Sequence, residues 1–323
     1  MKIVYDSRHK VYSPTKNDLL NLRNYIITDE KGLEDLHKSL PLLNDVEFIH
    51  CREFPKSFLY SVHNTDYVRW LESYCKGLDN GKDYFPTLFG RERVYDNFSP
   101  ITKETFDVAW LSAQIALTGA REMITTDSDI VALTRPGGIH AMSDKCGGKN
   151  FFCNPSIAAE YIVMEEMRNV AILNIGGYHA NATQDFFYDD PDALTLSVHC
   201  SPEECFPWIS GHEWETGKDI GKGFNHNIPL PKGSDFKELL WALELVISQI
   251  IDYEPEYLII TLSMNIHESH PEKIFKLKND DFQEIGKAIK SIKVPKLILL
   301  EGGMEFENSD VPFSLFIKGV EDD

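Results

Sequence analysis

The 323-residue sequence has few features of a membrane, secreted or nucleic-acid-binding protein. No run of residues approaches the roughly 18 apolar residues of a transmembrane helix, and the opening M-K-I-V-Y-D is typical of a strand rather than a signal peptide. Basic residues are scarce: 32 Lys and Arg stand against 51 Asp and Glu, and the formal net charge of -19 repels phosphate backbones and anionic membranes. We therefore predict a protein that binds neither nucleic acid nor membrane and that is cytoplasmic, with export by a route without an apolar leader as the alternative.

Paired cysteine motifs are also missing. The six cysteines form no C-x-x-C pair, so neither a zinc knuckle nor a C-x-x-C redox motif is indicated. A disulfide framework is typical of much shorter secreted chains. We predict that the cysteines are mostly buried thiols: Cys51, Cys75, Cys146, Cys153, Cys200 and Cys205.

Short β-branched runs alternate with longer amphipathic segments along the whole chain, and no Ser/Gly linker or internal repeat interrupts them. This pattern predicts an α/β fold with a mostly parallel sheet, in one domain spanning residues 1–323. The expected strands are 129–133, 169–175, 193–199, 256–263 and 295–300, and the expected helices are 103–124, 155–167, 236–253 and 281–292.

The loops 136–148 and 174–182 directly follow two of these strands. In open α/β sheets, ligands bind in the crevice beyond the carboxyl ends of the strands. We therefore expect the chemistry of the protein to lie in these two loops.

Motifs in and beyond these loops occur in a fixed order. They are R-P-G-G-I-H-A at 135–141 with G-G-K-N-F-F-C-N at 147–154, I-L-N-I-G-G-Y-H-A-N-A-T-Q at 172–184, I-T-L-S-M-N at 260–265 and E-G-G-M at 301–304. In this order the chain resembles the histone deacetylase and acetylpolyamine amidohydrolase family, whose elements read R-P-P-G-H-H-A, G-G-Y-C-F-x-N-N, D-x-D-x-H-H-G-N-G-T-Q, S-x-G-x-D and E-G-G-Y. The resemblance implies a three-layer α/β/α arginase/deacetylase-like fold with a mostly parallel central sheet.

The resemblance also implies where the family's catalytic metal would bind. Family members hydrolyse an acetyl amide with a zinc ion held by Asp, His and Asp. The corresponding residues here are Gly176, Tyr178 and Asn265. Glycine has no donor, a neutral phenol is a poor zinc ligand, and the amide has lost its charge. We therefore expect no catalytic zinc and no cofactor.

The other catalytic positions are changed as well. Ile139 stands in place of the first histidine of the family's tandem pair, and Met304 in place of the tyrosine that stabilises the oxyanion. His140 remains, with Asn181 at its usual partner position, as the one residual catalytic candidate, and a core histidine without a function is the alternative. Asn174 replaces the buried aspartate that helps to hold a structural potassium ion, so we expect that ion to be lost too.

Several further residues are candidates on the same resemblance. His179 is a weaker catalytic candidate, for which a structural role is the favoured alternative. A relocated metal site at His199, His267 and His270 is not favoured, because Glu268 is the only acid nearby. The expected substrate pocket contains the following residues, although core packing is the favoured alternative for the two phenylalanines: Asp96, Lys149, Phe151, Phe152 and Gly303.

Three functions stay open at this point. The first is a pseudoenzyme that uses the deacetylase scaffold to bind an acetylated amine, a peptide or a protein. The second is an amide hydrolase with rebuilt chemistry around His140. The third is a structural partner of an active deacetylase, and the family favours a homodimer.

Overall fold

The computed structural model describes residues 1–12, 22–40, 46–84, 93–96, 98–166 and 169–321. In this part of the chain eight strands form one sheet in the order β2-β1-β3-β8-β7-β4-β5-β6, and neighbouring strands all pair in parallel. The strands are β1 (Lys2–Tyr5), β2 (Glu47–His50), β3 (Ile130–Ala132), β4 (Val170–Ile175), β5 (Ala193–Cys200), β6 (Asn225–Leu230), β7 (Tyr257–Leu262) and β8 (Lys296–Leu300). Each of the five predicted strands is confirmed to within two residues at either end.

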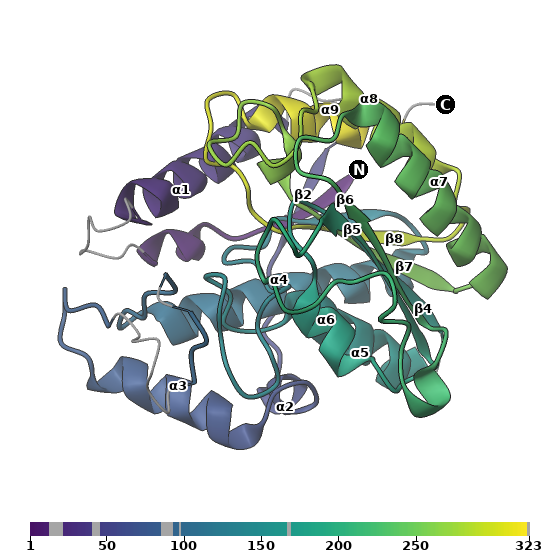
Figure 1. Ribbon diagram of the computed structural model, residues 1–323. Helices are drawn as coiled ribbons and strands as arrows, with labels where there is room; N and C mark the ends of the chain where they lie inside the picture. The colour runs from purple at the N-terminus through teal and green to yellow at the C-terminus, as the bar shows by residue number, and fades with distance from the viewer. Residues whose placement is uncertain (13–21, 41–45, 85–92, 97, 167–168, 322–323) are drawn as a thin grey trace.

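Helices cover both faces of this sheet (Figure 1). The helices are α1 (Leu22–Ser39), α2 (Ser57–Tyr60), α3 (Thr65–Gly77), α4 (Thr105–Thr126), α5 (Asn154–Glu166), α6 (Asn181–Phe186), α7 (Phe236–Tyr253), α8 (Asn279–Lys290) and α9 (Asp310–Glu321), with 3-10 turns η1 (Ser7–Val11), η3 (Asp219–Gly221) and η4 (Met264–Ile266). Helices α4 and α5 lie below the sheet in Figure 1, and α7, α8 and α9 lie above it. The three-layer α/β/α architecture is confirmed.

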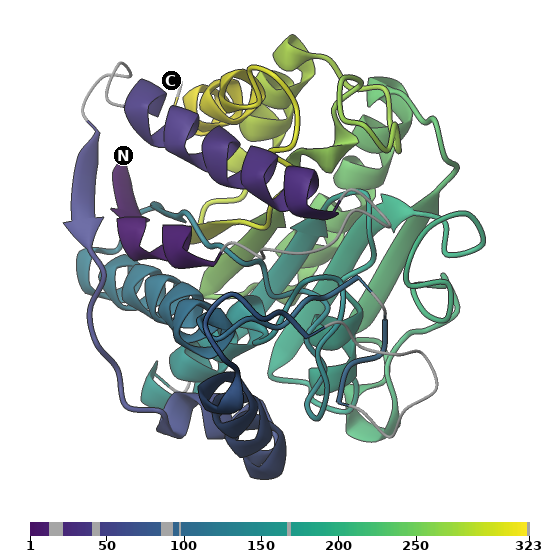
Figure 2. The same cartoon turned by 90° about the vertical axis from the view of Figure 1, so that its left-hand side faces the viewer.

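Side chains of one strand alternate between the two helical layers. In β8, Ile298 belongs to the core that includes Phe282 of α8 and Phe313 of α9, whereas Leu297 belongs to the core that includes Ile115 of α4. Both faces are therefore dry, which explains why the central strands are continuous apolar runs rather than alternating ones. Figure 2 shows α1 lying beside α9, so the amino-terminal helix completes the upper layer.

Helix α7 begins and ends where the sequence predicts because its ends carry specific signals. Asp235 accepts hydrogen bonds from the backbone N–H groups of Lys237 and Glu238, and the Glu238 side chain accepts one from the backbone of Asp235. This capping box fixes the start. Glu254 adopts a left-handed conformation with φ 53° and ends the helix.

The prediction for the cysteines needs one correction. Cys75, Cys146 and Cys153 are buried thiols, and Cys51 is a half-buried one. Cys200 and Cys205, however, form a disulfide, with their Cα atoms 6.0 Å apart. The chain makes a turn directly after β5, in which the backbone N–H of Cys205 donates to the carbonyl oxygen of Ser201. This turn brings the two cysteines together, and a search for C-x-x-C spacing does not detect them because four residues separate them.

Among the described residues, no helix has the length and apolar character needed to span a bilayer. The carboxyl ends of all eight strands lie at the same edge of the parallel sheet. The loops 136–148 and 174–182 therefore lie at that edge, as the sequence predicts, together with the loops that follow β5, β7 and β8.

Candidate functional site

A cavity of about 560 Å³ opens at the carboxyl edge of the sheet. All five loops named above contribute residues to it, and the loop after β5 contributes the aromatic side chains of Phe206 and Trp208. The lining residues are Tyr12, Phe98, Arg135, Pro136, Gly137, Ile139, His140, Gly148, Lys149, Asn150, Gly176, Tyr178, Glu204, Cys205, Phe206, Trp208, Lys232, Ser263, Asn265, Glu272, Ile274, Glu301, Gly302, Gly303 and Glu305. A volume of this size is typical of a small-molecule site.

The three positions of the family's metal ligands come together in this cavity. Gly176, Tyr178 and Asn265 all line it. The Asn265 side-chain oxygen accepts a hydrogen bond from the backbone N–H of Gly177 at 2.8 Å. A Cβ atom at Gly176 would lie 3.3 Å from the Cβ of Ser263, so a small shift would make room for a larger side chain there. The three residues supply no anionic donor, and they do not fit a zinc ion that must be dehydrated and neutralised.

Tyr178 remains a neutral phenol in this position. Burial, and then the nearby Glu272 carboxylate, raise the pKa of Tyr178 far above its ordinary value. A phenolate could bind a metal ion, but this environment disfavours the phenolate. The Tyr178 ring packs edge-on against His140 and Phe206, with ring centroids 6.0 Å apart in both cases. The side chain therefore forms part of an aromatic wall.

His140 is the one residue of the family's catalytic set that keeps its side chain and faces the cavity. Its Nδ1 atom lies 2.6 Å from the side-chain oxygen of Asn181, so the proton of the neutral ring is on Nδ1. Burial is the largest cause that lowers the pKa of His140 to about 4, and the positive charge of Lys149 contributes in the same direction. The ring is therefore neutral at pH 7, and its Nε2 atom is an acceptor. Ile139 beside it also lines the cavity but has no polar atom to offer.

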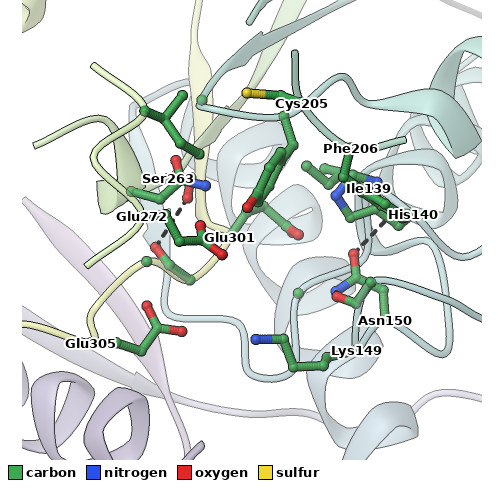
Figure 3. A pocket seen from close by; sticks show the side chains of 18 of the residues that line it. Ile139, His140, Lys149, Asn150, Cys205, Phe206, Ser263, Glu272, Glu301 and Glu305 are labelled. Carbon is green, nitrogen blue, oxygen red and sulfur yellow. Dashed lines mark hydrogen bonds between the residues drawn. The ribbon is translucent and has the colours of Figure 1, made fainter. Parts of the chain in front are cut away.

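A set of carboxylates that the sequence does not predict lies opposite His140. Figure 3 shows Glu272, Glu301 and Glu305 on one side of the cavity, and His140 with Asn150 on the other. Glu301 accepts a hydrogen bond from the backbone N–H of Gly138, and burial raises its pKa to about 7. The loop after β8 therefore contacts the loop after β3 through this side chain.

The carboxylate of Glu305 is held in place by a hydrogen bond from a buried histidine. The Glu305 Oε2 atom lies 3.1 Å from Nε2 of His270, whose side chain is fully buried. The Nδ1 atom of His270 accepts a hydrogen bond from the backbone N–H of Glu272 at 3.3 Å, so the ring proton is on Nε2 and is donated to Glu305. His267 instead lies near Asn279, at 3.0 Å, and stacks on Phe306. These histidines do not meet His199.

Lys149 lies in the cavity as predicted, and its backbone explains how. Gly148 and Lys149 both have positive φ, 60° and 61°. The turn is held by Asp96, which accepts the Gly148 backbone N–H, and by Ser99, which accepts the Lys149 backbone N–H at 2.7 Å. Figure 3 shows the Lys149 ammonium group directed into the cavity.

Five of the predicted site residues do not line the cavity: Asp96, Phe151, Phe152, Met304 and His179. Asp96 is buried behind the turn that it holds, and burial raises its pKa. Phe151 and Phe152 lie in the core with α3 and α4, because a large apolar ring gains more from packing there than from an open pocket. Met304 is 1% exposed and belongs to the core next to α1 and α9, so its thioether faces away from the cavity. Gly303, in contrast, lines the cavity.

His179 lies beneath the cavity in a network of buried polar groups. Its ring nitrogens lie 3.2 Å from the Ser210 hydroxyl and 3.1 Å from the Gln184 side-chain oxygen. Gln184 also accepts hydrogen bonds from Asn225 and Asn227. Both ring nitrogens of His179 are engaged, so the geometry favours the structural role over the catalytic one.

Asn174 occupies the position of the family's buried potassium ligand. Its amide nitrogen donates to the carbonyl oxygen of Tyr178 and to the hydroxyl of Ser197, both at 2.9 Å, and its oxygen accepts the Thr261 hydroxyl at 2.9 Å. The amide thus supplies donors to oxygens that could otherwise bind a cation. With no carboxylate at this position, the residues do not fit the family's potassium ion.

No group of three or more His, Cys, Asp or Glu side chains in the described residues is arranged to hold a metal ion. The acidic side chains of the cavity are thus too dispersed to form a shared metal site. The sequence analysis does not predict this carboxylate wall, although Glu301 is the first residue of the E-G-G-M motif and Glu305 directly follows the motif.

Comparisons with known proteins agree with this architecture. A family model for the histone deacetylase domain matches residues 30–317. Acetylpolyamine amidohydrolase 2 of Pseudomonas aeruginosa is 32% identical over 289 residues, which cover 84% of each chain. Acetylpolyamine amidohydrolase 1 of the same organism is 34% identical over 296 residues, which cover 85% of this chain and 86% of that protein.

The solved structures give the same result for the fold. The crystal structure of an acetylpolyamine aminohydrolase from Burkholderia pseudomallei superposes with a TM-score of 0.90 at 23% identity, covering 100% of this chain and 99% of that chain. The crystal structure of a histone deacetylase homologue from Aquifex aeolicus superposes with a TM-score of 0.78 at 25% identity, covering 98% of this chain and 80% of that chain.

Proposed function

Because the chain belongs to the histone deacetylase family, we propose that it is a member without the catalytic zinc ion, and that it acts through its cavity as a binding or regulatory protein. The observation that carries the proposal is that Gly176, Tyr178 and Asn265, which stand at all three metal positions, line one cavity and include no anionic ligand. Because its relatives include proteins named acetylpolyamine amidohydrolase, we expect the ligand of the cavity to be an amine or an acetylated amine.

The chemistry of the cavity supports the loss of hydrolysis. In the family, the metal polarises the carbonyl and lowers the pKa of a bound water from about 15.7 toward 7. None of the residues at the metal positions is an anionic ligand, and Met304 is buried in the core, where it cannot donate a hydrogen bond to an oxyanion. Loss of one oxyanion donor alone costs about a hundred- to a thousand-fold in rate.

The test combines metal content with turnover. The purified protein is analysed for zinc, and it is incubated with an acetyl-lysine peptide and with an acetylpolyamine after addition of zinc. We expect far less than one zinc per chain and no released acetate. A stoichiometric zinc content together with turnover would overturn the proposal.

An amide hydrolase with rebuilt chemistry is the second candidate, because the Nε2 atom of His140 faces the cavity as a neutral acceptor and could remove a proton. In that case a screen of amide substrates would reveal an activity that His140→Ala abolishes. A role as the structural partner of an active deacetylase stays a prediction, and co-purification with a zinc-containing relative would support it.

A further inference from the structure

The polar groups on one side of the cavity are carboxylate acceptors, although Arg135, Lys149 and Lys232 also line it. An acetyl carbonyl needs a Lewis acid or a hydrogen-bond donor, but the zinc positions have no anionic ligand, Ile139 is apolar, and Met304 faces the core. Glu272 and Glu305 bring carboxylates in their place. The side of the cavity that carries Glu272 and Glu305 recognises a group rich in hydrogen-bond donors better than it recognises a carbonyl.

Glu272 carries an acceptor without a donor. Its Oε2 atom is buried and has no hydrogen-bond partner among the described residues. The nearest histidine atom, Nδ1 of His270, lies 3.9 Å away and already accepts the backbone N–H of Glu272, so it has no proton to give. A carboxylate oxygen without a donor is unfavourable, and the Glu272 side chain, which is 35% exposed and lines the cavity, can accept a hydrogen bond from an external donor.

His140 supplies a second acceptor from the opposite wall. The residue is only 4% exposed, and its Nδ1 proton is used by Asn181. The Nε2 lone pair has no partner among the hydrogen bonds of the described residues, while the ring lines the cavity. Glu272 and His140 thus line one cavity from two different loops.

Aromatic side chains complete a site for a positive charge. The rings of Tyr178 and Phe206 lie beside His140, and Trp208 packs edge-on against Phe206 with centroids 5.2 Å apart. Aromatic faces attract ammonium and guanidinium groups, most strongly where water is excluded. A bare divalent ion is a poorer fit, because no three acidic or histidine side chains of the described residues could hold one.

We propose that the cavity binds an unacetylated alkylammonium or guanidinium group, with Glu272, Glu305 and His140 as its acceptors. This inference rests on the proposed function and refines it, because it assigns the charged form of an amine, rather than the acetylated form, as the ligand. Lys149 opposes the ligand, since its ammonium group enters the same cavity (Figure 3), and Arg135 and Lys232 line the cavity as well. The affinity is therefore a balance between the carboxylates and these cations.

The test compares two small molecules that differ only in acetylation. n-Butylammonium and N-butylacetamide are titrated into the full-length protein, and binding is followed by calorimetry or by NMR chemical shifts. We expect n-butylammonium to bind at least about tenfold more tightly, a difference of about 1.4 kcal/mol. Equal affinity, preference for the amide, or no binding of either molecule would overturn the inference.

Three variants separate the site from a general charge effect. Glu272→Gln keeps the shape and is expected to weaken n-butylammonium about tenfold, whereas Lys149→Met is expected to strengthen it. Glu284→Gln, at an exposed position on α8 where Glu284 pairs with Lys287, changes the net charge equally and is the control that should have no effect. Because Lys149→Met moves the affinity in the opposite direction, misfolding of one variant cannot mimic the expected pattern.

The two proposals fail in different ways. A protein that binds zinc and releases acetate from acetylated substrates refutes the proposed function. A protein that is free of zinc and inactive, but prefers N-butylacetamide, refutes only the assignment of the charged amine.

Discussion

Replacement of Gly303 by alanine tests whether the cavity wall is built as described. Gly303 has a φ of +82°, and a Cβ atom there would overlap the backbone nitrogen of Asn265 and lie 2.7 Å from the backbone nitrogen of Met264. The left-handed conformation costs alanine about 1–2 kcal/mol. The overlap with backbone that cannot rotate away adds about 1–3 kcal/mol, so we expect a total loss of about 2–5 kcal/mol in the free energy of unfolding.

The chain offers a matched control for this variant. Gly81 has a φ of +71°, but a Cβ atom there would have no neighbour within 4 Å. Gly81→Ala therefore includes the conformational cost without the overlap, and we expect a loss of about 1 kcal/mol. Equilibrium unfolding in urea, followed by circular dichroism, measures both. If Gly303→Ala is no more destabilising than Gly81→Ala, the packing of this loop against Asn265 is wrong.

Two further predictions concern stability. Burial lowers the pKa of both His63 and His199 from 6.5 to about 4, so the unfolded chain takes up protons first as the pH falls, and each residue should cost about 2 kcal/mol between pH 7 and pH 5. Urea unfolding at the two pH values checks this, and a pH-independent midpoint would contradict it. Asn174→Asp removes the donor to Tyr178 and Ser197 and buries a charge, so we expect about 3 kcal/mol of destabilisation that potassium chloride relieves more than choline chloride. Thermal unfolding measures the effect, and a selective effect of potassium on the unsubstituted protein would contradict our interpretation.

The central strands could be predicted because both faces of the sheet are buried, and continuous apolar runs result. The strands that were not predicted, β2 and β6, lie at the two edges of the sheet. Residues Glu47 and His50 of β2 are exposed, and β6 contains Asn225, Asn227 and Pro229, which have low strand propensity. Edge strands are specified by pairing with a neighbour rather than by apolar pattern, and pairing is not visible in a local stretch of sequence.

The residues of the site also fall into those that the sequence could predict and those that it could not. Gly176, Tyr178 and Asn265 could be placed together because each follows a strand in a motif of fixed order. Glu272 and Phe206 could not, since each lies several residues beyond its strand, and only the folded path of the loop brings it back to the cavity. Long loops carry function without a local pattern, and their side chains must be located in three dimensions.

The central claim is that positions 176, 178 and 265 do not hold zinc. The most direct measurement is the zinc affinity of the protein and of Asn265→Ala, obtained by competition with a fluorescent chelator at neutral pH. We predict that the unsubstituted protein binds zinc no more tightly than Asn265→Ala does, and that neither binds one equivalent tightly. Stoichiometric, tight binding of one zinc ion that Asn265→Ala abolishes would contradict the claim.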